Sequence, residues 1–155
     1  TLPGFMGDIG YAQSNRERYE GFCQALMDAG KTPNPSLCLT TPLGIDSYRE
    51  EIDSFLSSLS RMPDAFVCAS DYVACILMQL LEKRGLRVPE DVAVSGFDNN
   101  IEDLLAENLT TVQVFNEELG SRLALQILYR IKYPHTPHEV TYLESKVLYR
   151  ASTGD

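Results

Sequence analysis

The feature that most constrains the fold of this chain is a repeated order of short apolar run, turn and amphipathic segment. The runs at residues 65–69 and 92–97 are almost wholly apolar, as in strands that are covered on both faces. Between them, residues 71–84 show the 3.6-residue periodicity of a helix. This alternation predicts an α/β fold in which a parallel sheet carries helices on both of its faces.

The same pattern divides the whole chain into expected elements. We expect strands at residues 4–7, 37–39, 65–69, 92–97, 109–115 and 140–148, helices at 14–29, 46–59, 71–84 and 116–133, and a short acidic turn or helix at 101–107. Ser14 with Glu17 has the spacing of a capping box, and Gly30 follows the last helical residue where a left-handed conformation is favoured. Asp71 and Asn116 are further N-cap candidates.

Length and charge limit the classes of protein that this chain can belong to. The 155 residues fit one domain, and the 22 acidic against 13 basic residues leave a net charge of −9. Such a surface repels a phosphate backbone, so a bare nucleic-acid-binding module is excluded. No apolar segment reaches the roughly 18 residues of a membrane span, and the first residues lack the pattern of a signal peptide.

The cysteines and the first residue give two further expectations. Cys23, Cys38, Cys68 and Cys75 lie in apolar runs without C-x-x-C spacing, which predicts core residues in a reducing, cytoplasmic compartment. The chain begins at Thr1 rather than Met, and we expect it to be a piece of a longer protein.

Polar residues follow three of the expected strands. In an open parallel sheet, ligands bind outside the carboxyl ends of the strands. The groups there are Ser14, Asn15, Arg16 and Arg18, then Ser70 and Asp71, then Asp98, Asn99 and Asn100. Carboxylates and guanidinium groups at such an edge could hold a polyhydroxyl or heterocyclic ligand. The alternative is that all three groups are helix caps and turn formers.

Catalytic and metal chemistry have little support in the sequence. Asp71 and Asp98 could form an acid–base pair, but no histidine lies near either in the sequence. His135 and His138 stand in a proline-rich loop without the Cys or Asp companions of a metal site. Phosphate-binding and nucleophile-elbow motifs are missing from the sequence. We therefore expect no catalytic residue, cofactor or metal.

Several spaced motifs together resemble one known family. They are P-D-A-F-V-C-A-S-D-Y-V-A, G-L-R-V-P-E-D-V-A-V-S-G-F-D-N, L-T-T-V, N-R-E-R-Y-E-G-F, E-E-L-G and V-L-Y-R-A-S-T. In this order they resemble the effector-binding domain of the lactose and galactose repressor family of bacterial transcription regulators, which has a periplasmic-binding-protein-like fold. The resemblance covers nearly the whole chain.

The resemblance implies a domain layout. Residues 8–110 would form the C-terminal subdomain, residues 111–138 a crossover strand and a helix that returns to the N-terminal subdomain, and residues 139–155 the closing strands. The N-terminal DNA-binding head and most of the first subdomain would be absent. A chain of this extent would leave the helix at residues 116–133 exposed, together with one wall of the ligand cleft.

The resemblance also assigns site residues. It places Ser14, Arg18, Ser70, Asp71, Asp98 and Asn99 at the ligand, with Arg18 clamping hydroxyls or a carboxylate. Two departures leave the ligand open. Ser70 stands where sugar-binding members commonly have Asn, and Pro42 and Leu43 stand where relatives often place an aromatic residue that stacks on the ligand.

A dimer interface is expected on two grounds. The helix at residues 71–81 is apolar almost all round, so it must be covered on both sides by the fold or by a partner. The resemblance places this helix and residues 101–105 at the interface of a homodimer. The interface residues expected from it are Tyr72, Cys75, Ile76, Ile101 and Leu105.

The leading hypothesis is therefore a ligand-sensing part of a bacterial transcription regulator. It would bind a sugar-like or other small molecule, control operator DNA through the absent head, and have no membrane partner. The alternative is a periplasmic sugar-binding protein of a transporter, which shares the two-subdomain layout. An enzyme with a doubly wound sheet is the third hypothesis.

Overall fold

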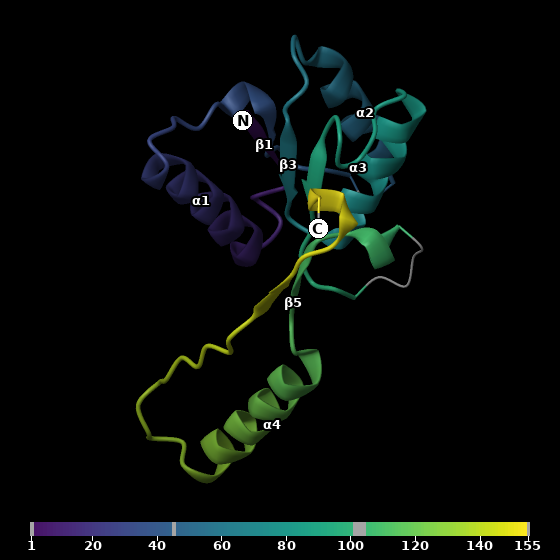
Figure 1. Ribbon diagram of the computed structural model, residues 1–155. Helices are drawn as coiled ribbons and strands as arrows, with labels where there is room; N and C mark the ends of the chain where they lie inside the picture. Colours follow the sequence, from purple (N-terminus) through teal and green to yellow (C-terminus); the bar gives the residue numbers. More distant parts are fainter. Residues whose placement is uncertain (1, 45, 101–104, 155) are drawn as a thin grey trace.

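A four-stranded parallel sheet forms the centre of the molecule. The computed structural model describes residues 2–44, 46–100 and 105–154. Strands β1 (Pro3–Met6), β2 (Cys38–Leu39), β3 (Ala65–Cys68) and β4 (Ala93–Ser95) lie in the order β2-β1-β3-β4. Phe5 pairs with Cys38 on one side and with Val67 on the other, and all three strand pairs are parallel (Figure 1). The predicted α/β fold class is confirmed.

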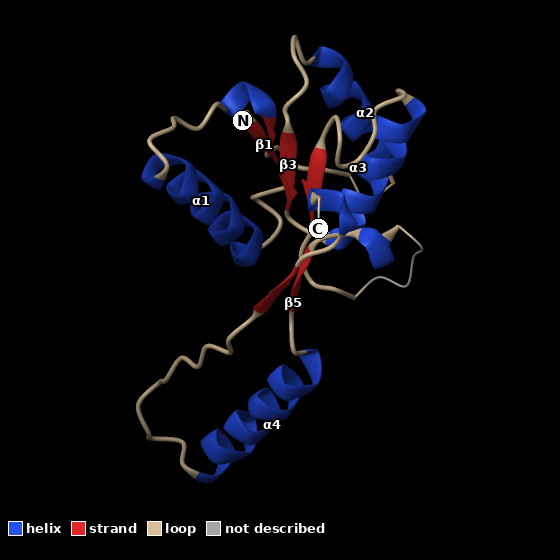
Figure 2. Ribbon diagram, in the orientation of Figure 1, coloured by secondary structure: helices blue, strands red, loops and turns tan. Residues whose placement is uncertain are grey.

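Helices cover the two faces of this sheet, as the apolar strands require. Helix α1 (Gln13–Asp28) lies on one face, and α2 (Tyr48–Ser58) and α3 (Asp71–Lys83) lie on the other (Figure 2). Side chains alternate along β1, so that Phe5 packs with α1 while Met6 packs with α2 and α3. Strands β1, β2 and β3 therefore each contribute to two cores.

Helix α3 is covered by the fold of its own chain. Cys75 and Ile76 are 5% and 7% exposed, and Leu77 and Leu81 are completely buried among the residues of α2 and the sheet. The apolar character of this helix therefore does not require a second subunit, which corrects one of the two grounds for a dimer. Of its predicted interface residues only Tyr72 is exposed, at 53%.

The other two predicted interface residues lie after β4. Leu105 is half-buried against the α2–α3 core. Ile101 lies outside the described residues. The interface of a homodimer thus stays a prediction.

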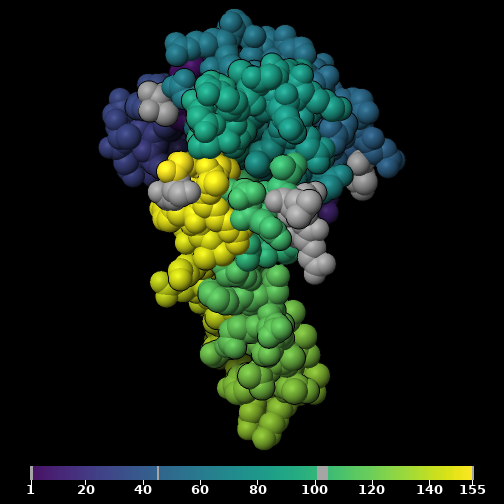
Figure 3. Space-filling model, turned by 45° about the vertical axis from the view of Figure 1, so that its right-hand side comes forward, coloured from purple at the N-terminus to yellow at the C-terminus, as the bar shows by residue number. Residues whose placement is uncertain are grey.

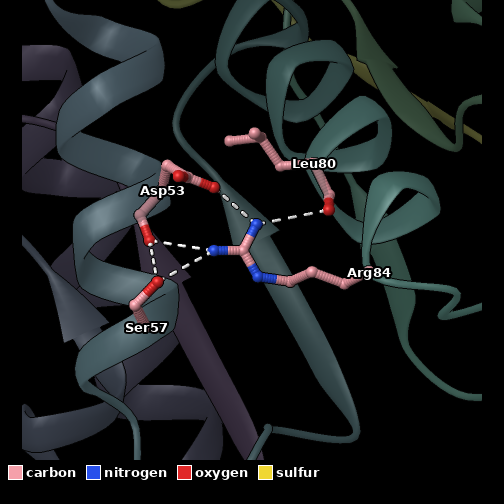
Figure 4. Close-up of polar contacts among 4 residues, drawn as sticks. All are labelled: Asp53, Ser57, Leu80 and Arg84. Atoms are coloured by element: carbon pink, nitrogen blue, oxygen red, sulfur yellow. Dashed lines mark hydrogen bonds and ion pairs between the residues drawn. The ribbon is translucent and has the colours of Figure 1, made fainter.

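Arg84, at the end of α3, joins this helix to α2. Its guanidinium group donates to the Asp53 carboxylate at 2.5 Å, to the Asp53 backbone oxygen at 3.0 Å and to the Ser57 hydroxyl at 3.0 Å (Figure 4). It also reaches the Leu80 carbonyl at 3.4 Å, in the last turn of its own helix. A cation here complements the α3 dipole and fixes the two helices against each other.

The last third of the chain leaves the sheet and returns to it. Strands β5 (Thr111–Gln113) and β6 (Lys146–Leu148) pair antiparallel, and α4 (Asn116–Lys132) lies beyond them. The chain from Thr110 to Val112 runs beside the end of β4, where Gly96 N–H donates to the Thr110 oxygen at 2.8 Å and Asp98 N–H to the Val112 oxygen at 3.0 Å. The strand predicted at residues 140–148 is only β6, because the preceding residues find no strand partner in the described structure.

Three short 3₁₀ helices complete the description. They are η1 (Pro35–Leu37), η2 (Ala106–Asn108) and η3 (Ala151–Thr153). The last of these fixes the returning chain to the sheet, since the Ser152 hydroxyl donates to the Val94 oxygen at 2.6 Å and accepts from Thr110 N–H at 2.8 Å.

Helix α4 projects from the body of the molecule (Figure 3). None of its residues is buried. The large apolar side chains that it leaves exposed are Leu119, Leu123, Leu125, Ile127, Leu128, Tyr129 and Ile131. The expected exposure of this helix is confirmed. No helix in the described ranges has both the length and the apolar character to span a bilayer.

The helix ends agree with the sequence only in part. Gly30 adopts the predicted left-handed conformation, with φ of +70°, and Gly85 adopts the same conformation after α3, with φ of +72°. The three predicted N-caps are wrong: Ala12, Ser70 and Phe115 occupy the cap positions, and Ser14, Asp71 and Asn116 lie inside the helices. At α3 the Ser70 hydroxyl accepts from Val73 N–H at 3.3 Å, which leaves the Asp71 carboxylate free to bond elsewhere.

We predict that Gly96→Ala destabilises the protein by about 2 kcal/mol, because overpacking a core costs this much. An added Cβ would lie 2.3 Å from Asp71 Oδ1 and 2.9 Å from a methyl carbon of Leu109. Urea unfolding measures the effect. Gly21→Ala is the matched control, since a Cβ there meets nothing within 4 Å and Ala favours α1 by about 1 kcal/mol. Equal stabilities of the two variants would contradict this account of Gly96.

Candidate ligand-binding site

A pocket lies at the edge of the sheet where β1, β3 and β4 end. Its volume is about 260 Å³. The residues that line it are Gly7, Asp8, Tyr11, Ala12, Ser14, Asn15, Arg18, Tyr48, Ala69, Ser70, Val73 and Asp98. They come from the loop after β1, the start of α1, the first turn of α2, the β3–α3 junction and the turn after β4. Parallel strands bring these separate segments to one edge.

Arg18 connects three of these segments. From α1 its guanidinium group donates to the Ala69 oxygen at 2.5 Å and to Asp98 Oδ1 at 3.3 Å, and it stacks on the Phe97 ring at 3.6 Å from the ring centre. Burial lowers the pKa of Arg18 from its ordinary value, and the Asp98 carboxylate opposes that shift. The cation is therefore held in a fixed place with incomplete solvation.

Asp98 is the anionic partner of Arg18. It follows β4 in a tight turn, with φ of +109°. Burial raises the pKa of its carboxyl group, the nearby Arg18 lowers it, and the negative charge of Asp71 raises it. Both members of the pair thus ionise less readily than they would in water. Polar ligand groups could replace the water that they lack.

Asp8 organises the opposite wall of the pocket. Its buried carboxylate accepts from Gly10 N–H at 2.7 Å and Tyr11 N–H at 3.0 Å through Oδ1, and from Leu43 N–H at 3.3 Å through Oδ2. The Asn15 side chain donates to the Asp8 backbone oxygen at 2.9 Å. One residue therefore fixes the loop before α1 and the segment before α2 together.

The structure brings four of the six predicted ligand residues to this pocket. Ser14, Arg18, Ser70 and Asp98 line it. Ser14 is the second residue of α1, which has no side-chain cap hydrogen bond, so its hydroxyl is not used as a cap. A ligand-binding role for these residues stays a prediction.

The other two predicted residues do not line the pocket. Asp71 is 2% exposed and accepts a 2.5 Å hydrogen bond from the Thr111 hydroxyl. Asn99 donates to Gln113 at 2.6 Å and accepts from Arg150 at 2.8 Å. Both side chains hold the crossover to the sheet. Asp71 is thus placed unfavourably for acid–base chemistry with a ligand in this pocket.

Asp8, Tyr11 and Tyr48 were not predicted as site residues. Asp8 follows the first strand and precedes Gly10, which is the pattern of a side chain that accepts from the backbone of a turn. This signal could have identified the loop. Tyr48 lies in the first turn of α2, and no pattern in the sequence indicates that it borders a pocket.

The lining groups suit a small polar ligand. Arg18 donates, Asp98 accepts, and the Ser14 and Ser70 hydroxyls can do both. In the described part of the chain no group of three His, Cys, Asp or Glu residues could hold a metal ion. The four cysteines form no disulfide; Cys68 and Cys75 are buried, while Cys23 and Cys38 are half-buried.

These features define a class, the ligand-binding α/β domains in which a pocket opens at the carboxyl edge of a parallel sheet. The sequence profile of the periplasmic binding protein-like domain matches residues 4–153, and the chain belongs to this family. Two curated relatives are transcription regulators. The transcriptional regulator DegA of Bacillus subtilis is 34% identical over 117 residues, which are 75% of this chain and 34% of DegA. The ribose operon repressor of Haemophilus influenzae is 30% identical over 138 residues, 88% of this chain and 41% of the repressor.

Solved structures show the same relationship. The complex of the transcriptional regulator CelR with cellobiose has a TM-score of 0.84 and 27% identity, over 97% of this chain and 46% of CelR. A LacI-type transcription regulator from Bifidobacterium animalis has a TM-score of 0.80 and 25% identity, over 97% of this chain and 58% of that protein. The predicted resemblance to the lactose and galactose repressor family is confirmed. The chain spans less than half the length of the two curated relatives.

We predict that Asp98→Asn raises stability at pH 7, because it removes a carboxylate whose folded-state pKa is raised by burial. Asn still offers an oxygen to Arg18 and tolerates the positive φ. The folded wild type takes up the proton at a higher pH than the unfolded chain does, so its disadvantage should shrink as the pH falls through the raised folded-state pKa and be gone below the unfolded value of about 4. Urea unfolding at pH 7 and pH 3 measures both effects.

Asp91→Asn is the control of opposite sign. Hydrogen bonds from Arg87 lower the pKa of Asp91 to about 2, so this carboxylate stabilises the fold at neutral pH and loses that effect as the pH falls toward 2. Its replacement should therefore lower stability at pH 7. If Asp98→Asn lowered stability at pH 7 as well, burial would not dominate at Asp98.

Proposed function

We propose that this chain is the C-terminal part of the effector-binding domain of a transcription regulator, and that its pocket binds a small polyhydroxyl or heterocyclic molecule. The Arg18–Asp98 pair carries the proposal. It places a donor fork and an acceptor, both partly buried, beside the hydroxyls of Ser14 and Ser70 at the carboxyl edge of the sheet. The cellobiose complex of a similarly folded regulator supports a sugar-like effector.

Control of DNA would depend on parts of the protein outside this chain. An effector that binds between this pocket and a second subdomain favours one arrangement of the two. The β5–β6 pair would transmit the change, because it connects the sheet to α4, whose apolar side chains are not covered by the described part of this chain. In a homodimer, that change would alter the spacing of two DNA-binding heads on operator DNA.

The alternative of a transporter's periplasmic binding protein has less support. The curated relatives that match over most of this chain are transcriptional regulators and repressors. Cysteines that form no disulfide suit a reducing cytoplasm. The same relatives favour a binding role over an enzyme.

A thermal-shift screen of the full-length protein tests this function. Sugars, sugar phosphates, nucleosides and purines form the panel. We expect one class to stabilise the native state by about 2.7 kcal/mol at 100 times its Kd. Arg18→Ala and Asp98→Ala should abolish the shift, whereas Arg122→Ala, which removes only an exposed ion pair with Glu118 on α4, should retain it. A hit that survives in both pocket variants would place the site elsewhere, and a panel without hits would contradict a small-molecule effector of these classes.

The dimer is tested separately at Tyr72, the predicted interface residue whose side chain stays exposed in this chain. Tyr72→Glu in the full-length protein should shift sedimentation from dimer toward monomer, because it places a charge in an apolar contact. Tyr142→Glu changes a tyrosine that is even more exposed and lies outside the predicted interface, and it should leave the dimer intact. An unchanged dimer for Tyr72→Glu would remove this residue from the interface.

A further inference from the structure

Three half-buried polar side chains join the turn after β4 to both segments that cross between the sheet and α4. They are Asn99 in the turn, Gln113 at the end of the outgoing strand β5, and Arg150 two residues after the returning strand β6. Asn99 follows the pocket residue Asp98 in the chain, but it does not line the pocket, and neither do Gln113 and Arg150. The three side chains therefore belong to the connection between the sheet and α4 rather than to the ligand site.

The Asn99 side chain connects the two segments through the two ends of its amide. Its oxygen accepts from the Arg150 guanidinium group at 2.8 Å, and its nitrogen donates to the Gln113 side-chain oxygen at 2.6 Å. An amide carries an acceptor and a donor on one rigid group, so it suits a place between a cation and a carbonyl oxygen. The φ of Asn99 is +50°, a conformation that asparagine tolerates better than most residues do. The residue type and the backbone therefore both fit the place between the segments.

Arg150 holds the returning segment to the residues that lead into the outgoing one. Its guanidinium group donates to the Ala106 oxygen at 3.0 Å and to the Leu109 oxygen at 3.0 Å, and both of these residues precede β5. Its backbone N–H donates to the Thr110 hydroxyl at 2.8 Å. Because a guanidinium group presents its donors in a rigid fork, one side chain can bind these two carbonyl oxygens and Asn99 at the same time.

The outgoing segment is also tied to this turn by its backbone. Asp98 N–H donates to the Val112 oxygen at 3.0 Å, directly before Gln113. Strands β5 and β6 then pair with each other, with Gln113 opposite Lys146 (Figure 1). Beyond this pair, α4 has no buried residue that would fix it to the sheet. The place of α4 relative to the sheet therefore depends on the two segments and on the turn that joins them.

We propose that Asn99, Gln113 and Arg150 form a latch through which the turn after β4 and the two crossover segments shift as one unit. The consequence of this inference rests on the proposed function, because a ligand that moves the turn would then move both segments together. Without the latch, each segment would follow the turn only through its own backbone contacts, and the two would move separately. The three residues are positioning residues, since they act on α4 through the segments that carry it.

Hydrogen exchange of the full-length protein, measured by mass spectrometry without ligand or DNA, tests the latch. Asn99→Gly removes the central side chain and keeps the positive φ, because glycine adopts that conformation readily. The amides of residues 110–113 and 146–150 should then exchange about tenfold faster in both segments alike, as expected when one network loses its central member.

Arg84→Lys is the matched control. It removes a guanidinium fork of the same kind, but from the contact of α3 with Asp53 on α2 instead of from the crossover. This change should leave exchange in residues 110–113 and 146–150 as it is in the wild type. If Asn99→Gly raised exchange in α2 and α3 as much as in the two segments, it would act through general stability, and the latch would be overturned.

Two variants at opposite ends of the latch test whether it acts as one unit. Gln113→Ala in the outgoing segment should speed exchange near Arg150, and Arg150→Lys, which lacks the fork, should speed exchange near Gln113. The double variant should exchange no faster than either single variant, because losses within one network are not additive. Gln113→Glu keeps an oxygen for the Asn99 amide and should preserve the protection of both segments.

The outcomes separate the latch from the proposed function. Faster exchange that is confined to the substituted segment, or effects of the two single variants that multiply in the double variant, would overturn the latch. Either result leaves the proposed function standing, because the exchange experiment contains no ligand. A thermal-shift panel without hits would contradict the proposed function instead, and the exchange result would still decide whether the turn and the two segments shift together.

Discussion

The hydrogen bond from Thr111 to the buried carboxylate of Asp71 determines where the chain leaves the sheet. Asp71 begins α3 directly after β3, and Thr111 begins β5 beside the end of β4. Gly96 leaves room for this carboxylate, because a Cβ there would lie 2.3 Å from Asp71 Oδ1. An unpaired carboxylate at this depth would cost several kcal/mol, so the contact strongly favours a single path for the crossover. The turn that carries Asp98 is held on both sides of this contact, because Asp71 N–H donates to the Phe97 oxygen and Asp98 N–H donates to the Val112 oxygen.

The charged residues of the pocket beside this crossover differ from Asp71 in how well the protein solvates them. At Asp71 the charge is satisfied inside the protein, whereas burial disfavours the ionised forms of both Arg18 and Asp98 even though they contact each other. Such a pair is poorly explained as a stabilising device. It is well explained as a ligand site, where stability is given up for groups that a bound molecule completes.

The order of strands and helices could be predicted from the sequence because it depends on local patterns. Alternating cover of the two faces requires apolar strands, and Gly30 and Gly85 mark helix ends that only glycine fits well. The choice between Ser70 and Asp71 as the cap of α3 could not be predicted. Both residues are good caps, and the decision rests on Thr111, a partner 40 residues away in the chain. The burial of Cys75 by its own chain could not be predicted either, because it depends on residues of α2 and the sheet that are distant in the sequence.

The site shows the same division between local and distant causes. Ser14, Arg18, Ser70 and Asp98 could be predicted because the carboxyl ends of parallel strands must meet at one edge. The places of Tyr11 and Tyr48 in the pocket could not, because they depend on Asp8, which joins two loops that are 35 residues apart in the chain. Asp8 accepts from Tyr11 N–H in the turn before α1 and from Leu43 N–H in the segment before α2. The shape of this part of the pocket therefore depends on the same buried carboxylate that closes the local turn, and the spacing of residues along the chain does not reveal that dependence.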